Sequence, residues 1–131
     1  MRFVNPLPFV SDMSRSVVFY REVLGLSVIA DHGNFVQFGN GFALHDGSTL
    51  LQTIFGNANA AEKPYGRKNF VLYFQVEDIE ATAAEIESKV DLIHSLCQQT
   101  WGERVFRFRD PDGHIIEIGE AQQGSKRKKT T

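Results

Sequence analysis

Two titratable side chains stand at matching places in the two halves of the 131-residue chain. His45 is the fourth residue after Gly41, and Glu117 is the fourth residue after Gly113. An imidazole and a carboxylate are both metal ligands, and a carboxylate that loses water can act as a general base. The sequence therefore predicts His45 and Glu117 as candidate metal ligands and Glu117 as a candidate catalytic residue. Either residue taken alone could also be an ordinary polar side chain facing solvent.

A repeated helical pattern precedes these positions in each half. Apolar residues fall at offsets 0, 4, 7 and 11, which is one stripe of an amphipathic helix. An aspartate stands directly before each stripe, where its side chain can cap free helix N–H groups. The caps are Asp12 and Asp78, and the stripes are Met13, Val17, Tyr20, Leu24 and Ile79, Ala83, Ile86, Val90.

Strand-like segments surround both predicted helices in the same order. One segment comes before each helix and three follow, and the last two are joined by a turn rich in glycine, asparagine, proline or aspartate. The chain thus has the order β-α-β-β-β twice, which predicts an α+β fold with helices on one face of the sheet and a cavity on the other. The predicted strands are 3–10, 26–31, 35–38 and 42–45, then 69–76, 91–97, 104–109 and 114–119.

Strand alternation places His45 and Glu117 on the cavity side, opposite their apolar neighbours. Pairing back across the turns predicts Phe35 beside His45 and Phe106 beside Glu117. A shift of about 66 residues between the modules aligns the first strands and predicts that Val71, Tyr73 and Gln75 face the cavity. The aligned pairs are Asn5 with Val71, Leu7 with Tyr73, and Phe9 with Gln75, while Pro6 and Pro8 indicate an edge or irregular strand.

Three segments together resemble the vicinal oxygen chelate superfamily, which contains glyoxalase I, bleomycin-resistance proteins and extradiol dioxygenases. They are FVSDMSRSVVFYREVLGL (9–26), VEDIEATAAEI (76–86) and FRDPDGHIIEIGE (108–120). The resemblance covers about residues 3 to 119. It implies two pseudo-symmetric β-α-β-β-β modules that form an open, cupped mixed sheet, usually completed or enlarged by dimerisation.

The same resemblance implies a divalent metal held by four cavity-facing side chains, at the positions of Asn5, His45, Val71 and Glu117. Val71 has no donor atom, and Asn5 offers only a neutral amide oxygen, which is a poor ligand for a transition ion. One imidazole, one carboxylate and an amide with water could still make a catalytic site. The departures favour a relative whose cavity binds an organic ligand without a complete metal site.

Composition limits the partners. The net charge of −2 gives no overall attraction to nucleic acid, and no apolar stretch is long enough to span a membrane. A single cysteine, Cys97, excludes an internal disulfide, indicates a reducing, cytoplasmic setting and is predicted to be a buried core residue.

The sequence predicts one domain over residues 1–121, with modules at about 1–46 and 69–120, and a disordered basic tail at 122–131 that contains Lys126 to Lys129.

The linker between the modules, residues 47–68, is long for a compact domain. Its first part, Leu50 to Phe55, predicts one short added strand, and its later part is small, polar and rich in turn residues. Segments of this kind are often ligand lids or plain connectors. Trp101 precedes the seventh strand and is predicted either as an aromatic lip of the cavity or as a plug of the core.

The leading hypothesis is a cytoplasmic homodimer that binds a small aromatic or apolar ligand in the cavity. The alternatives are a metal-dependent lyase, isomerase or dioxygenase that uses His45 and Glu117, and a non-catalytic interaction module with a filled cavity. The predicted ligand-binding residues are Asn5, Phe9, Phe35, His45, Tyr73, Trp101 and Phe106.

Overall fold

The computed structural model describes residues 1–121, so the predicted basic tail lies outside the described residues. The fold is α+β, with two β-α-β-β-β modules whose four-stranded mixed sheets stay open, as predicted. The chain divides into two compact units, each described by itself. Unit 1 contains residues 1–69 and 110–114, and unit 2 contains the rest of the described chain.

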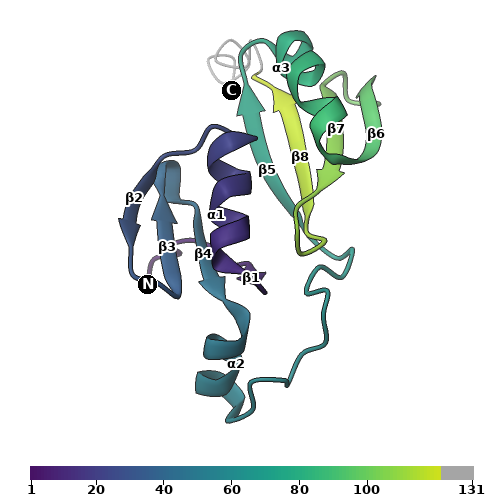
Figure 1. Ribbon diagram of the computed structural model, residues 1–131. Coiled ribbons are helices and arrows are strands. Elements are labelled where there is room, and N and C mark those ends of the chain that lie inside the picture. Colours follow the sequence, from purple (N-terminus) through teal and green to yellow (C-terminus); the bar gives the residue numbers. More distant parts are fainter. Residues whose placement is uncertain (122–131) are drawn as a thin grey trace. The chain divides into compact units, whose positions relative to one another are not determined.

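Unit 1 holds the first sheet, in the strand order β1-β4-β3-β2 (Figure 1). β1 runs parallel to β4, and the other pairs are antiparallel. The strands are β1 (Phe9–Val10), β2 (Val28–Asp31), β3 (Phe35–Phe38) and β4 (Ala43–Asp46), and a single 3-10 turn (Gly39–Gly41) joins the last two. β1 lies at the sheet edge, as Pro6 and Pro8 predicted. It is only two residues long, so the predicted strand at 3–10 was too long.

Helix α1 (Met13–Glu22) packs on the first sheet with Ser16 and Tyr20 buried. Of the other predicted stripe residues, Met13 and Val17 are half-buried, and Leu24 lies beyond the end of the helix. Asp12 caps it, because its Oδ1 accepts a hydrogen bond from the backbone N–H of Arg15 at 3.1 Å. Tyr20 is fully buried, and its ring meets Phe38 and Phe42 at centroid distances of 6.1 and 4.8 Å. Burying an aromatic or large aliphatic side chain contributes about 1.5–3 kcal/mol, so this face is the core of unit 1.

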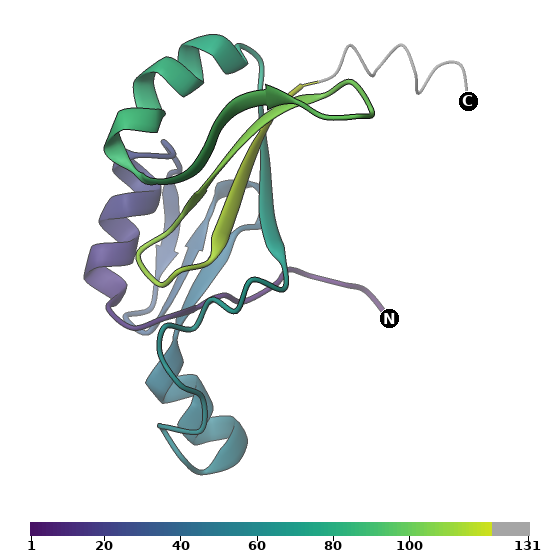
Figure 2. The ribbon, with the colours of Figure 1, turned by 90° about the vertical axis from the view of Figure 1, so that its right-hand side faces the viewer.

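Unit 2 repeats the arrangement with the strand order β5-β8-β7-β6. Its strands are β5 (Val71–Val76), β6 (Asp91–Gln98), β7 (Arg104–Arg109) and β8 (Ile115–Glu120). Helix α3 (Ile79–Ile86) and a 3-10 turn (Glu87–Lys89) follow β5, and Asp78 caps the helix as predicted. Figure 2 shows α3 along one face of this sheet. The side chains of Phe106, Phe108, Ile116 and Ile118 are buried.

The segment after β4 is a helix, so the predicted strand at Leu50–Phe55 is wrong. Helix α2 (Gly47–Phe55) begins at Asp46, whose Oδ2 accepts the backbone N–H of Thr49 at 2.9 Å. It ends at Gly56, whose positive φ of 70° suits a glycine. The β-forming residues were outweighed by the aspartate cap before them and the glycine after them.

Cys97 is exposed, so its predicted place in the core is wrong. It lies near the end of β6, at the edge of the second sheet, where alternate side chains face solvent. Among the described residues, no helix combines the length and the apolar character that a membrane crossing requires.

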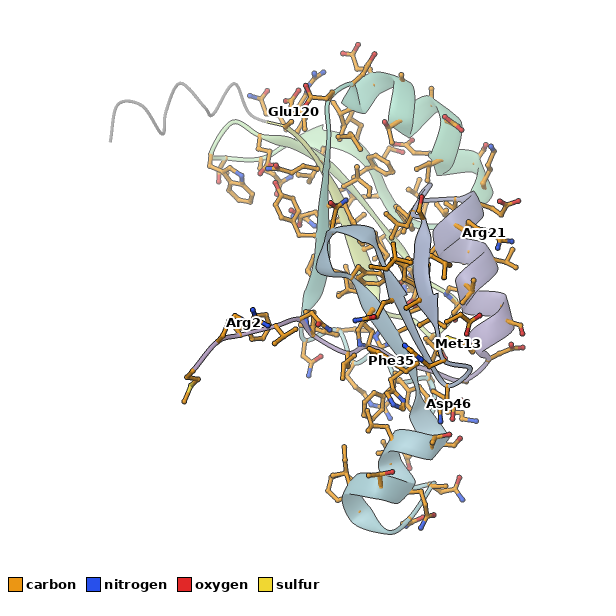
Figure 3. All side chains as sticks on the ribbon, turned by 90° about the vertical axis from the view of Figure 1, so that its left-hand side faces the viewer. Arg2, Met13, Arg21, Phe35, Asp46 and Glu120 are labelled. Carbon is orange, nitrogen blue, oxygen red and sulfur yellow. The ribbon has the colours of Figure 1, made fainter. Side chains whose placement is uncertain are left out.

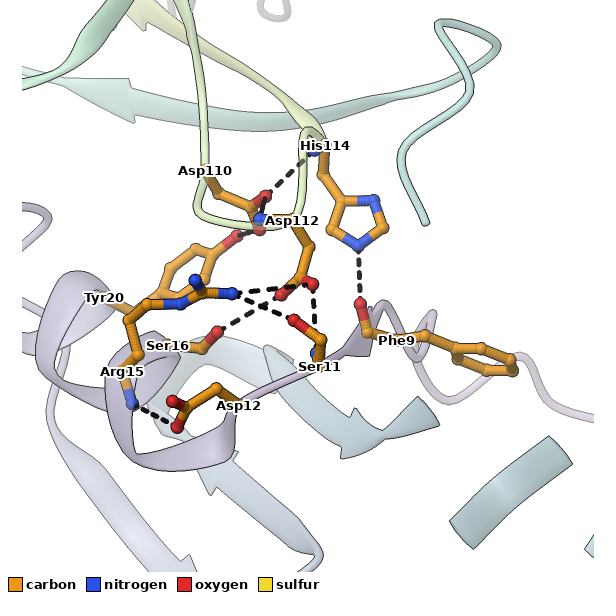
Figure 4. A network of polar contacts seen from close by, with 9 residues as sticks. All are labelled: Phe9, Ser11, Asp12, Arg15, Ser16, Tyr20, Asp110, Asp112 and His114. Carbon is orange, nitrogen blue, oxygen red and sulfur yellow. Dashed lines mark hydrogen bonds and ion pairs between the residues drawn. The ribbon is translucent and has the colours of Figure 1, made fainter. Parts of the chain in front are cut away.

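The Asp-Pro-Asp-Gly turn belongs to unit 1, although the strands on either side of it belong to unit 2. Asp110 is 4% exposed, and its Oδ2 accepts a hydrogen bond from the Tyr20 hydroxyl at 2.6 Å (Figure 4). Asp110 Oδ1 accepts the backbone N–H groups of Asp112 and His114, both at 2.9 Å. Asp112 Oδ1 in turn accepts the backbone N–H of Ser11 at 3.0 Å. The turn therefore acts as a buried polar anchor for α1.

This environment raises the pKa of two groups. Burial, followed by the negative charge of Asp110, raises the pKa of the Tyr20 hydroxyl well above its ordinary value. Burial also raises the pKa of the Asp110 carboxyl, while the charge of His114 and the hydrogen bond from Tyr20 offset part of that rise. Tyr20 is therefore a neutral donor throughout the physiological pH range.

The change Tyr20→Phe tests the anchor. It leaves a buried carboxylate oxygen without this donor, so the free energy of unfolding should fall by about 1–3 kcal/mol, measured by urea denaturation. Tyr65→Phe removes a hydroxyl from another aromatic residue of unit 1 and serves as the control. Equal losses in both variants would contradict the assigned role of Tyr20.

The raised pKa of Tyr20 also predicts the pH dependence of stability. The unfolded chain releases this proton near pH 10, whereas the folded chain keeps it, so the stability that the group contributes is present below about pH 10 and is lost as pH rises further. Urea midpoints at about pH 8 and pH 11 should therefore differ more for the wild type than for Tyr20→Phe. If the urea midpoint of Tyr20→Phe changed between about pH 8 and pH 11 as much as that of the wild type, the raised pKa of Tyr20 would be contradicted.

Candidate functional site

A row of polar side chains crosses the second sheet on the face opposite α3. The strand registers place Tyr73 of β5 beside Glu117 of β8, Glu117 beside Arg107 of β7, and Arg107 beside His94 of β6. Directly paired residues project to the same face of a sheet, so these four form one surface, which we call the polar row. Leu72, Ile116 and Phe108 alternate with them and are buried under the helix.

Arg107 is the centre of the polar row. Its Nε donates to Glu117 Oε1 at 2.8 Å, its Nη1 lies 2.9 Å from His94 Nε2, and its Nη2 lies 3.4 Å from Gln99 Oε1. His94 Nδ1 lies 2.9 Å from the Ser95 carbonyl oxygen, so Nδ1 carries the proton and Nε2 accepts from Arg107. His94 is therefore a neutral imidazole held by hydrogen bonds at both nitrogens.

Sequence reasoning missed Arg107, because the predicted register of the second hairpin is wrong by one residue. Phe106 pairs with Ile118 and is fully buried, instead of lying beside Glu117 on the open face. Arg109 pairs with Ile115, so the turn between the strands holds the five residues 110–114. The predicted strands left only residues 110–113 for this turn. A one-residue slip moves a side chain to the other face of a sheet. The alternation in RVFRFR was the signal that could have identified Arg107.

A second polar group joins β5 to the loop before β7. The Tyr73 hydroxyl donates to Glu103 Oε2, and Gln75 Nε2 donates to that hydroxyl at 2.8 Å. Trp101 Nε1 donates to Glu103 Oε1 at 3.0 Å, while 60% of the Trp101 surface stays exposed. Loss of water, followed by the hydrogen bond to Glu103, raises the pKa of Tyr73. Trp101 is thus held by its N–H with its ring outward, and it does not plug the core.

Gly119 makes room for this group. A Cβ at that position would lie 2.5 Å from Glu103 Oε2 and 2.9 Å from the Tyr73 hydroxyl. Both distances are far inside van der Waals contact, so a larger residue at 119 would displace the two side chains. The glycine is therefore explained by close packing of polar side chains against the strand.

Unit 1 carries a row of rings at the corresponding place on its own sheet. His45 pairs with Phe35 on one side, as predicted, and with Phe9 on the other. Phe35 also stacks on His32 at a centroid distance of 5.8 Å, and Phe9 meets Tyr65 edge-on at 5.7 Å. We call these five residues the aromatic strip. Figure 3 labels Phe35, near the end of the sheet where Asp46 starts α2.

The first strands are aligned differently from the predicted shift. Phe9 lies beside His45 and Tyr73 lies beside Glu117, so Phe9 corresponds to Tyr73 and not to Gln75. The difference is an even number of residues, and it leaves the predicted faces unchanged. Asn5 precedes β1, and its side-chain Nδ2 donates to the Pro6 carbonyl oxygen at 2.7 Å.

The four positions that the resemblance assigned to a metal do not fit a divalent ion. Val71 has no donor atom, and Asn5 offers only a neutral amide oxygen, while its Nδ2 donates to the Pro6 carbonyl oxygen. Glu117 already has a guanidinium at 2.8 Å, and this fixed positive charge repels a second cation. His45 remains the one good ligand, with its Nδ1 3.0 Å from the Asp46 carbonyl oxygen. Across residues 1–121, no set of three or more His, Cys, Asp or Glu side chains comes together to bind a metal.

Comparison with known proteins gives the family. The glyoxalase-like domain matches residues 3–123 of the chain. The uncharacterized protein YraH of Bacillus subtilis is 30% identical over 125 residues, which cover 90% of this chain and 97% of YraH.

Two solved structures show the same fold. A protein of unknown function from Agrobacterium tumefaciens is 52% identical, with a TM-score of 0.88 over 93% of this chain and 95% of the other. A glyoxalase/bleomycin resistance protein/dioxygenase from Nocardioides is 20% identical, with a TM-score of 0.72 over 95% and 86%. The resemblance seen in the sequence is therefore confirmed, and the chain belongs to the glyoxalase-like domain family of the vicinal oxygen chelate superfamily.

Proposed function

We propose that this protein binds a small, flat aromatic compound on the aromatic strip of unit 1. The observation that carries the proposal is a run of five rings. Phe9, His45 and Phe35 pair on one face of the sheet, and His32 and Tyr65 extend the run at its two ends through ring contacts with Phe35 and Phe9. Phe9, Phe35 and His45 are half-buried, so each ring is fixed by its neighbours and still presents surface. Rings held in this way can stack on a ligand without losing much conformational freedom.

The alternation of the strands explains why the strip faces outward. Val10, Val36 and Leu44, which lie next to the strip residues along their strands, are all buried in the core of unit 1. The strip is the opposite face of the same three strands, and it is built from aromatic side chains. An exposed apolar surface rimmed by polar residues is a common mark of a ligand-binding site.

The proposal does not involve a resident metal, because the donor set at the four candidate positions does not fit one. Within residues 1–121, no contact favours the metal-dependent alternative or the filled interaction module. The homodimer, the cytoplasmic location and the catalytic role of Glu117 stay predictions from the sequence.

Calorimetric titration with 2-naphthol tests the strip. Phe35→Leu and Phe9→Leu keep an apolar side chain but remove a ring, and each should weaken binding about 2- to 12-fold, the range for losing one stacking contact. The saturated analogue decahydro-2-naphthol should bind more weakly than 2-naphthol to the wild type, because it cannot stack.

Phe55→Leu is the matched control, since Phe55 is an exposed phenylalanine of unit 1 on α2, outside the strip. It should leave the affinity unchanged. If all three leucine variants bind 2-naphthol as the wild type does, the strip is not the binding surface.

Removal of divalent ions gives an independent test. Because no metal takes part in stacking, the affinity for 2-naphthol should be the same before and after extensive dialysis against a chelator. Recovery of lost affinity by one specific divalent ion would contradict the metal-free proposal and restore the metalloenzyme hypothesis.

A further inference from the structure

The polar row of unit 2 presents a donor and an acceptor side by side. Arg107 uses one N–H on each of its three nitrogens, toward Glu117, His94 and Gln99. A guanidinium has five N–H groups, so one more on Nη1 and one more on Nη2 can donate. Glu117 uses Oε1 for Arg107, and its second oxygen can accept.

The charges of the pair decide which group it can bind. Arg107 and Glu117 are 24% and 14% exposed, and their opposite charges cancel at 2.8 Å. His94 is neutral, as its two hydrogen bonds require. A ligand carboxylate placed at Arg107 would approach the negative charge of Glu117. A ligand cation placed at Glu117 would approach the guanidinium. Both cost free energy in a partly buried site.

We propose that the Arg107–Glu117 pair is a binding site for a neutral carboxamide or lactam group. Its carbonyl oxygen accepts from the Arg107 Nη groups, and its N–H donates to Glu117. The pair thereby offers a charge-assisted donor and a charge-assisted acceptor to one planar group, without a net charge on the ligand. The residues of this site belong to unit 2, whereas those of the aromatic strip belong to unit 1.

The supporting contacts fix the pair in place. His94 and Gln99 hold the end of the guanidinium, and Glu117 holds its Nε, so the plane of the guanidinium is set before a ligand arrives. Tyr73 pairs with Glu117 on the other side, and its own hydroxyl is committed to Glu103. A preorganised donor loses little conformational entropy on binding, which favours recognition of a small group.

Nuclear magnetic resonance titration with benzamide, benzoate and benzamidinium tests the proposal, since the three compounds share one ring and differ in charge. The reporter is the Arg107 Nε–H signal, assigned from its loss in Arg107→Lys. Benzamide should shift this signal and bind at least about tenfold more tightly than the two charged compounds. Phe35→Leu in the aromatic strip should leave this titration unchanged, so failure here and failure of the strip proposal are distinguishable.

Two variants separate the proposed role from a purely structural one. Arg107→Lys should weaken benzamide about fivefold or more, because a lysine lacks the planar fork. Since this variant lacks the Arg107 Nε–H signal, its affinity is read from the backbone amide signals of β7 and β8, which are also followed in the wild type. Arg109→Lys is the matched control on the same strand, where Arg109 is ion-paired with Asp91, and it should have no effect. Glu117→Gln removes the negative charge while keeping the shape, so benzoate should bind more tightly than benzamide in this variant. Circular dichroism checks that each variant is folded.

Several results would overturn the proposal. One is tighter binding of benzoate or benzamidinium than of benzamide to the wild type. Another is an equal effect of Arg109→Lys and Arg107→Lys. A third is the absence of any shift of the Arg107 signal at roughly 10 mM benzamide, the weak end expected for a ligand of this size.

Discussion

The ion pair between Arg107 and Glu117 determines what the open face of the second sheet can do. At the carboxylate that the sequence resemblance assigned to a metal, the chain supplies a guanidinium of its own at 2.8 Å. The carboxylate is thereby neutralised within the polypeptide, and a charged, solvated acid becomes one half of a hydrogen-bonding pair. The contacts to His94 and Gln99 keep the guanidinium in place, so both halves of the pair are fixed.

The two modules use one backbone plan for different chemistry. His45 and Glu117 occupy the same place in their sheets, each between a parallel neighbour and an antiparallel neighbour. The neighbours of His45 are Phe9 and Phe35, which make the first surface aromatic. The neighbours of Glu117 are Tyr73 and Arg107, which make the second surface polar. A repeated fold can thus diverge by changing only the residues that flank one position.

The repeat, the helix caps and the strand order could be predicted from the sequence, because each depends on local periodicity and turn composition. Asp12 and Asp78 cap their helices, and Phe35 lies beside His45, as expected. Counting residues back across the turn missed Arg107, since register depends on the length of a turn that the buried Asp110 organises. Helix α2 was missed because its cap, Asp46, also ends a strand. Local signals specified the elements, while long-range polar contacts fixed which side chains meet.

A double-mutant cycle between Arg107 and Glu117 tests the central claim most directly. The free energy of unfolding is measured for the wild type, Arg107→Gln, Glu117→Gln and the double variant. We expect a favourable coupling of about 1–3 kcal/mol, as for a partly buried, charge-assisted hydrogen bond. A coupling near zero would mean that the guanidinium does not hold the carboxylate, and the account of this surface would be wrong.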